Sequence, residues 1–190
     1  MADEKAEMAK TEQAGEMTAD QQHSEATAEK VEVSKAEFDK MQAALKEEVK
    51  QIASLWLDRG VDGFRLDATR YLVETGAAGG QQDTPETHAV LKEFASHVRR
   101  VKPEAFLVGE NWADTGIIAT YYGSKSVAGG DELPASFDFP LSEQVLRALS
   151  QGNAAPVAAK LDEVQRLYPK GAIDAPFLTN HDQVRLATQL

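Results

Sequence analysis

Four short apolar stretches alternate along the chain with longer stretches in which apolar residues recur every three or four positions. A short apolar run is typical of a buried strand, and the longer repeat is typical of an amphipathic helix. Strands that alternate with helices form parallel sheets with right-handed crossovers. The pattern therefore predicts an α/β fold with about four strands and flanking helices. The predicted strands are residues 61–67, 105–110, 135–139 and 173–180.

Two architectures fit this order: an open, doubly wound sheet and part of a closed (β/α) barrel. No Gly-rich G-x-G-x-x-G or P-loop segment follows a predicted strand, which argues against the nucleotide-binding form of the open sheet. A complete eight-stranded barrel usually needs about 250 residues, whereas this sequence has 190. The length therefore argues against a complete barrel and leaves both architectures open.

The predicted helices have recognisable start and stop signals. Ser34 and Glu37 fit the capping-box pattern, and Gly60 is expected to end the first helix. Thr84 followed by Pro85 supplies an N-cap and a first-turn proline for the second helix. Two more helices are predicted near residues 142–150 and 156–168. The first helix has one apolar face, made of Phe38, Met41, Leu45, Val49, Ile52 and Trp56.

Residues 1–33 differ in composition from the rest of the chain. They are rich in Ala, Glu, Lys, Gln and Thr, and no Leu, Ile, Phe, Trp or Tyr occurs before Phe38. Such a segment cannot bury enough apolar area to offset the entropy lost on ordering. We predict a disordered or transiently helical acidic tail over residues 1–33 and one partial (β/α) domain over residues 34–190.

Charge and composition limit the classes of molecule that the chain is expected to bind. The formal net charge is −11, from 31 acidic and 20 basic residues, so we expect neither nucleic acid nor an anionic membrane as a partner. The chain has no cysteine, which excludes disulfides and thiolate metal sites. No export signal is visible at Met1, and no segment approaches the roughly 20 apolar residues of a membrane helix. Localisation stays unassigned.

Three predicted strands end in a carboxylate, which is where a (β/α) barrel places catalytic groups. Arg65 and Asp67 lie two positions apart, so a strand would point both to one face. An arginine beside a carboxylate favours its ionised form, which suits a nucleophile. A structural ion pair is the alternative interpretation. Glu110 emerges from an apolar run, as a partly desolvated general acid would, and the alternative is a glutamate that merely ends a strand.

The remaining candidates would contact substrate. Trp112 could stack on a sugar ring, or it could belong to the core. His181 could donate a hydrogen bond to a substrate hydroxyl, and Asp182 could oppose the positive charge of an oxocarbenium-like state. An Asx turn after a strand is the alternative for this pair. Acid, base and charge stabilisation together favour glycoside hydrolysis.

The three segments resemble motifs of the α-amylase superfamily of glycoside hydrolases, which are (β/α)₈ barrels. The resemblance runs from about Glu47 to Leu190 and covers the motifs of the fourth, fifth and seventh barrel strands. The matching segments are Gly63-Phe64-Arg65-Leu66-Asp67-Ala68, Val108-Gly109-Glu110-Asn111-Trp112 and Phe177-Leu178-Thr179-Asn180-His181-Asp182. The resemblance implies that the chain folds as a fragment of a parallel (β/α) barrel.

The resemblance also implies a role for each matching position. Asp67 would be the nucleophile, Glu110 the general acid and then the general base, and Asp182 the residue that stabilises the transition state. Arg65 would orient Asp67, and His181 would bind substrate hydroxyls. The reaction would be hydrolysis of α-glucosidic bonds in starch-like glucans or maltooligosaccharides with retention. A retaining pair needs carboxyl groups about 5 Å apart, which is the expectation for Asp67 and Glu110.

The sequence departs from the family in several respects. The family's first motif, around the third strand, has no counterpart, and strands one to three and eight are absent. Where the family often has Lys-His, this chain has Arg70 and Tyr71, and Arg70 is expected to reach substrate hydroxyls. A calcium ion, common in the family, would use a backbone carbonyl near Tyr71, but its other usual ligands lie in the absent part. The resemblance therefore implies calcium as a cofactor of the full-length family without favouring it in this chain, and we expect weak or no activity from this chain alone.

Two other functions fit the sequence. One is a non-catalytic sugar-binding or regulatory remnant that keeps the motifs without the full cleft. The other is a helical interaction protein that acts through residues 1–59. The sequence separates neither α-1,4 from α-1,6 preference nor hydrolysis from transglycosylation, and it predicts no oligomeric state.

Overall fold

The computed structural model describes residues 34–76 and 79–189. The predicted tail, residues 1–33, lies outside this range. The chain divides into two compact units with the boundary between Gln42 and Ala43. The first turns of the long helix α3 (Lys35–Asp58) therefore fall in one unit, and the rest of the fold lies in the other.

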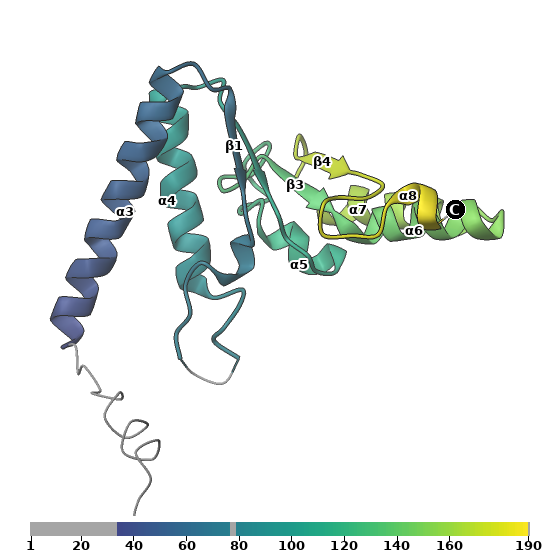
Figure 1. Ribbon diagram of the computed structural model, residues 1–190, viewed down its shortest axis with the longest axis horizontal. Coiled ribbons are helices and arrows are strands. Elements are labelled where there is room, and N and C mark those ends of the chain that lie inside the picture. The colour runs from purple at the N-terminus through teal and green to yellow at the C-terminus, as the bar shows by residue number, and fades with distance from the viewer. Residues whose placement is uncertain (1–33, 77–78, 190) are drawn as a thin grey trace, which may run out of the picture. The chain divides into compact units, whose positions relative to one another are not determined.

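Four strands form one parallel sheet, as the sequence pattern predicts (Figure 1). Their order in space, β1-β2-β3-β4, equals their order in the chain. A doubly wound sheet reverses its order at a switch point, so the uniform progression favours the barrel over the open sheet. The strands are β1 (Gly63–Leu66), β2 (Phe106–Gly109), β3 (Ala135–Asp138) and β4 (Ile173–Pro176).

The predicted helices are confirmed, with shifts of a few residues at their ends. Glu37 N donates to Ser34 Oγ (3.3 Å) and Ser34 N donates to Glu37 Oε2 (3.0 Å), which is a complete capping box. Thr84 caps the second helix by accepting from Thr87 N (3.1 Å). These helices are α3, α4 (Pro85–Val101), α6 (Phe139–Gln151) and α7 (Ala155–Leu167). Three shorter elements, too brief to show a period in the sequence, are η1 (Thr69–Tyr71), α5 (Thr115–Thr120) and α8 (Leu186–Gln189).

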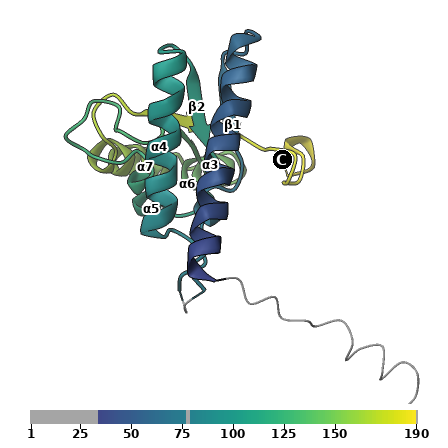
Figure 2. The same ribbon diagram turned by 90° about the vertical axis from the view of Figure 1, so that its left-hand side faces the viewer.

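The core lies between the sheet and the helices on one of its faces. From Ala43 onward α3 runs beside α4 (Figures 1 and 2), and Lys50 Nζ pairs with Glu93 while Ser54 Oγ lies 2.8 Å from His97 Nε2. Burial of apolar surface at this layer is the main force that fixes the strands. The central cluster consists of Leu57, Leu91, Ala95, Val98, Leu107, Tyr121 and Leu133.

The apolar face predicted for the first helix exists but is not covered. Trp56 is 45% exposed and Leu45 is 60% exposed, whereas the buried residues of α3 are Ala53 and Leu57. The three-to-four repeat correctly predicts the helix, but the residues that face the sheet lie one position beyond Ile52 and Trp56. The other members of the face, Phe38, Met41, Val49 and Ile52, are also exposed.

The last strand is shorter than predicted. The sequence indicates a strand over residues 173–180, but β4 ends at Pro176. Proline has no backbone N–H to donate to a sheet ladder, so the chain leaves the sheet there. His181 and Asp182 therefore lie in an irregular segment several residues beyond the strand rather than at its end.

Candidate active site

All four strands contribute to one cavity at the C-terminal edge of the sheet. Its volume is about 230 Å³. Arg65 comes from β1, Glu110 directly follows β2, and Phe137 comes from β3. The segment after β4 supplies the remaining lining residues, which are Phe177, Thr179, Asn180 and His181. Two aromatic rings beside hydrogen-bonding side chains form a lining with both apolar and polar groups, of the kind that binds small polar ligands.

Arg65 connects two of the predicted catalytic carboxylates. Its Nη2 lies 3.0 Å from Glu110 Oε2, and its Nη1 pairs with Asp67 Oδ1. The contact with Asp67 follows from their spacing on β1, because residues two apart on a strand share a face. The contact with Glu110 follows from the register, which places Leu66 beside Gly109. One guanidinium therefore holds both carboxylates at the same edge of the sheet.

Glu110 is the most firmly held of the three acids. Its side chain is 12% exposed, and Oε2 accepts a hydrogen bond from Ala68 N (3.2 Å) in addition to the ion pair with Arg65. Both contacts involve Oε2. Within residues 34–76 and 79–189, Oε1 has no hydrogen-bond or ion-pair partner.

Asp67 and Asp182 are more open. The Asp67 side chain is 76% exposed and that of Asp182 is 51% exposed. Asp182 contacts its own neighbours: Oδ2 lies 3.0 Å from His181 Nε2, and its backbone N donates to Asn180 Oδ1 (3.0 Å). Asp182 is not among the residues that line the cavity. Arg65, Glu110 and His181 thus line one cavity. Asp67 is joined to it by the ion pair with Arg65 but, like Asp182, is not among its lining residues.

Arg70, predicted to reach substrate, has three contacts within the protein. Its Nε and Nη2 donate to the two carboxylate oxygens of Asp83 (2.9 and 2.5 Å), and its Nη1 donates to Trp112 O (2.7 Å). These bonds from Arg70 are the main reason why the pKa of Asp83 lies below its usual range. Arg70 therefore supports the loop after Glu110. Trp112 stacks on Phe139 with ring centroids 4.6 Å apart, and it stays half exposed.

The described residues do not fit the calcium site of the family. Among them, no group of three or more His, Asp or Glu side chains could hold a metal ion. No chemical step here is therefore assigned to a metal. In the same part of the chain, no helix combines the length and apolar character needed to cross a bilayer.

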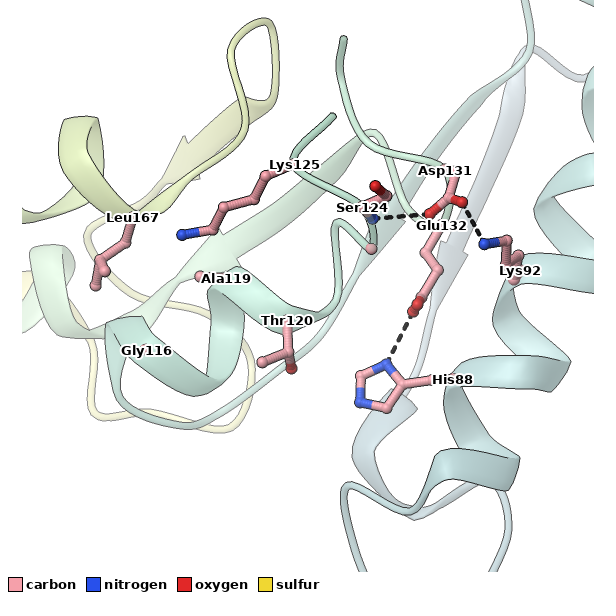
Figure 3. A pocket seen from close by; sticks show the side chains of 11 residues that line it. His88, Lys92, Gly116, Ala119, Thr120, Ser124, Lys125, Asp131, Glu132 and Leu167 are labelled. Carbon is pink, nitrogen blue, oxygen red and sulfur yellow. Dashed lines mark hydrogen bonds and ion pairs between the residues drawn. The ribbon is translucent and has the colours of Figure 1, made fainter. Parts of the chain in front are cut away.

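A second cavity, of about 420 Å³, lies beside α4 and α5, apart from the three motifs. Figure 3 shows His88 pointing toward Glu132, with Nδ1 and Oε2 2.9 Å apart, and Lys92 paired with Asp131. The hydrogen bond to Glu132 raises the pKa of His88. Both pairs join α4 to the loop that precedes β3, so their role in the fold is to fix that loop.

Sequence analysis missed the buried polar residues behind Glu110. Thr69, Asn111 and Ser136 are each 0% exposed, and they are joined by hydrogen bonds. Asn111 lies inside a recognised motif, but nothing in the motif indicates that its side chain is buried. Thr69 and Ser136 carry no local signal, because their partners are distant in sequence.

Comparison with known proteins identifies the family of the chain. The family model described as "Alpha amylase, catalytic domain" matches residues 13–190. Alpha-amylase 3 of Dictyoglomus thermophilum is 35% identical over 147 residues, which cover 76% of this chain and 26% of that protein. Trehalose synthase/amylase of Mycolicibacterium smegmatis is 33% identical over 143 residues, which cover 75% of this chain and 24% of that protein.

Solved structures show the same fold. The α-amylase from H. orenii matches with a TM-score of 0.61 and 32% identity, over 77% of this chain and 28% of that one. This chain therefore spans about a quarter of the length of the relatives it matches. Its four parallel strands with their helices are part of a (β/α) barrel. By family model, sequence and fold, the chain belongs to the α-amylase family of glycoside hydrolases.

Proposed function

We propose that this chain carries the catalytic pair of a retaining glycoside hydrolase that acts on α-glucosidic bonds of starch-like glucans or maltooligosaccharides. The observation that supports this best is the ion-pair bridge in which Arg65 contacts both Asp67 and Glu110. A retaining mechanism needs two carboxyl groups on opposite sides of one glycosidic bond. The bridge supports the proposal because it holds two carboxylates at one edge of the sheet.

The proposed reaction has two steps. In the first, Asp67 attacks the anomeric carbon while Glu110 gives its proton to the departing glycosidic oxygen, so the C–O bond breaks and a glycosyl ester forms. In the second, Glu110 takes a proton from water, the water oxygen attacks the same carbon, and the ester bond to Asp67 breaks. Two displacements at one carbon restore the α configuration.

The other residues have supporting roles in this proposal. Arg65 orients Asp67, because a guanidinium binds carboxylates strongly. His181 lines the cavity with Glu110 and would hold a substrate hydroxyl, and half-exposed Trp112 would contact a neighbouring ring. Asp182 would have to approach the cavity to oppose positive charge on the sugar.

A second function, sugar binding without turnover, is favoured by one observation. Asp182 lies outside the cavity, so the residue that would stabilise the transition state is not in position. The cavity is also smaller than the roughly 300–1,000 Å³ typical of pockets that enclose a drug-sized ligand. A glucan would lie partly outside it.

Hydrolysis of a chromogenic maltooligosaccharide by the full chain separates the two functions. The catalytic proposal predicts turnover that is weak in this chain alone but measurable, and that Glu110→Gln lowers by about 100-fold or more, because general acid catalysis commonly contributes that much. Glu143→Gln, an exposed glutamate on α6, is the matched control and should retain activity. Calorimetric binding of maltoheptaose without any turnover would reject the catalytic proposal and support the sugar-binding one.

A further inference from the structure

A buried polar network lies behind the proposed acid Glu110. Thr69 in η1, Asn111 after β2 and Ser136 in β3 are each 0% exposed. A buried hydroxyl or amide costs free energy unless it finds a hydrogen-bond partner. Three such groups lie behind the Glu110 carboxylate, and each needs a hydrogen-bond partner. They find these partners mainly in one another.

The hydrogen bonds of this network run in one direction. Thr69 Oγ1 donates to Asn111 Oδ1. Asn111 Nδ2 then donates to Ser136 Oγ (3.1 Å), and Ser136 Oγ donates to Gly109 O (3.4 Å). The network therefore joins the segments that follow β1 and β2 to β3 by side-chain contacts, beside the last backbone pair of β2 and β3, Gly109 with Ser136.

Thr69 also holds Glu110 directly. Its backbone N donates to Glu110 O (3.2 Å), and its Oγ1 lies 3.2 Å from the same oxygen, so that oxygen and Asn111 Oδ1 share its single hydroxyl proton. The preceding residue, Ala68, donates its N–H to the carboxylate oxygen Oε2. Ala68 has left-handed backbone angles, φ 42° and ψ 46°, which cost a non-glycine residue about 1–2 kcal/mol. The bonds of Thr69 oppose that strain and keep the Ala68 N–H pointed at Glu110.

Gly109 provides the space that the network needs. A Cβ at this position would lie 2.4 Å from Leu133 Cδ1, 3.0 Å from Asn111 Nδ2 and 3.4 Å from Thr69 Oγ1. Glycine therefore allows Thr69 and Asn111 to approach the strand that leads into Glu110.

We propose that Thr69 is a positioning residue for the acid–base function of Glu110, acting through the Ala68 N–H and the Glu110 carbonyl, with Asn111 and Ser136 fixing Thr69 in turn. This inference rests on the proposed role of Glu110. Thr69 is fully buried and touches no substrate, so its effect is on the placement of the carboxyl group. A misplacement of about 1 Å in an active site can cost on the order of 100-fold in rate.

The positioning role of Thr69 can be tested with two substrates whose leaving groups differ in their need for a proton from Glu110. Thr69→Val removes the hydroxyl with little change of shape. It should lower kcat/KM about 10- to 100-fold on a maltooligosaccharide, whose leaving oxygen needs a proton. With α-maltosyl fluoride, fluoride departs without protonation, and kcat/KM should fall less than about 3-fold. Thr69→Ser restores the hydroxyl and should restore both values.

A matched control separates positioning from loss of stability. Thr87 is also 0% exposed, and its Oγ1 accepts from Val73 N (3.0 Å) in the first turn of α4. Thr87→Val should lower stability to a similar degree without changing the ratio of the two kcat/KM values. Equal losses on both substrates in Thr69→Val, or no loss on either, would overturn the proposal.

If the wild type turns over neither substrate, that result alone rejects the proposed hydrolase function. NMR of the full chain then tests the positioning role of Thr69 separately. Amide exchange at Ala68 should become at least about 10-fold faster in Thr69→Val, and the Glu110 side-chain carboxyl resonance should move, while both stay unchanged in Thr87→Val. Unchanged signals in Thr69→Val would overturn the positioning role.

Discussion

The β1–β2 end of the sheet and the segment after β4 both carry a proposed catalytic acid, but they hold it very differently. Glu110 is 12% exposed, bonded to Ala68 and paired with Arg65. Asp182 is 51% exposed and contacts its own neighbours in the chain. The same kind of side chain is thus preorganised at one end and unconstrained at the other. Electrostatic preorganisation supplies much of enzymatic rate enhancement. Residues at the β1–β2 end should therefore contribute more to the rate than residues in the segment after β4.

The largest expected effect follows from Arg65. Arg65→Ala removes the bridge between Asp67 and Glu110 and should lower kcat/KM on a chromogenic maltooligosaccharide about 100-fold or more. His181→Ala, at the β4 side of the same cavity, should cost about 10-fold, the value of one ordinary hydrogen bond. Arg147→Ala, an exposed arginine on α6, is the control. A greater loss for His181→Ala than for Arg65→Ala would reverse the comparison.

The next effect concerns Gly109, where the β1–β2 end is packed most closely. Gly109→Ala places a methyl group 2.4 Å from Leu133 Cδ1, and overpacking of this kind costs about 1–3 kcal/mol. Urea unfolding should show this loss. Gly152→Ala, at the exposed end of α6 where a Cβ would meet nothing within 4 Å, tests backbone strain without overpacking and should cost less. Equal losses would show that close packing at Gly109 is unimportant.

A smaller effect arises between β3 and β4, where Asp138 and Asp174 are neighbours. Burial, together with the charge of Asp138, raises the pKa of Asp174 to about 7. The folded state then keeps a proton that the unfolded chain, with an aspartate pKa of about 3.9, has already lost. Stability from this group is fully present below pH 4 and is lost as the pH rises through 7.

Asp174→Asn should therefore flatten the fall in stability between pH 5 and pH 8. Because Asp174 is only partly buried, solvent screening limits the change to on the order of 1 kcal/mol. Urea midpoints at the two pH values measure it. The control is Asp162→Asn, at an exposed site on α7. A wild-type chain as stable at pH 8 as at pH 5 would contradict the assignment.

The smallest effect is at Ala68. Glycine adopts left-handed backbone angles without strain, so Ala68→Gly should stabilise the folded state. Glycine also gives the unfolded chain more entropy, so the net rise in the free energy of unfolding should be about 0.5 kcal/mol. Thermal unfolding against Ala158→Gly, in the helical interior of α7, provides the contrast, because that change should destabilise. A loss of stability at Ala68 would show that its conformation is not strained.

The same comparison explains what sequence could and could not predict. The strands were predictable because short apolar runs end in polar residues, and Arg65 with Asp67 was predictable because strand spacing is local. The early end of β4 was missed, although Pro176 was visible, because the apolar run continues past it to Leu178. The partner of Arg70, Asp83, lies in a loop 13 positions away, and no periodic signal links them.

Burial on the helices was equally hard to predict. Trp56 and Leu57 are adjacent and both apolar, and only the position of the sheet decides that Leu57 is buried while Trp56 is 45% exposed. Thr69 follows β1 and Ser136 lies in β3, so their shared network appears only when the strands are side by side.

Covalent trapping tests the central claim most directly. 5-Fluoro-α-glucosyl fluoride should react with the full chain by forming an ester bond to Asp67 and releasing fluoride, because the ring fluorine slows the second step more than the first. Peptide mass spectrometry should find the adduct on the peptide that contains Asp67, and Asp67→Asn should abolish it. A chain that binds maltoheptaose but forms no adduct, or forms it on another carboxylate, would contradict the assignment of Asp67 and Glu110 as a retaining pair.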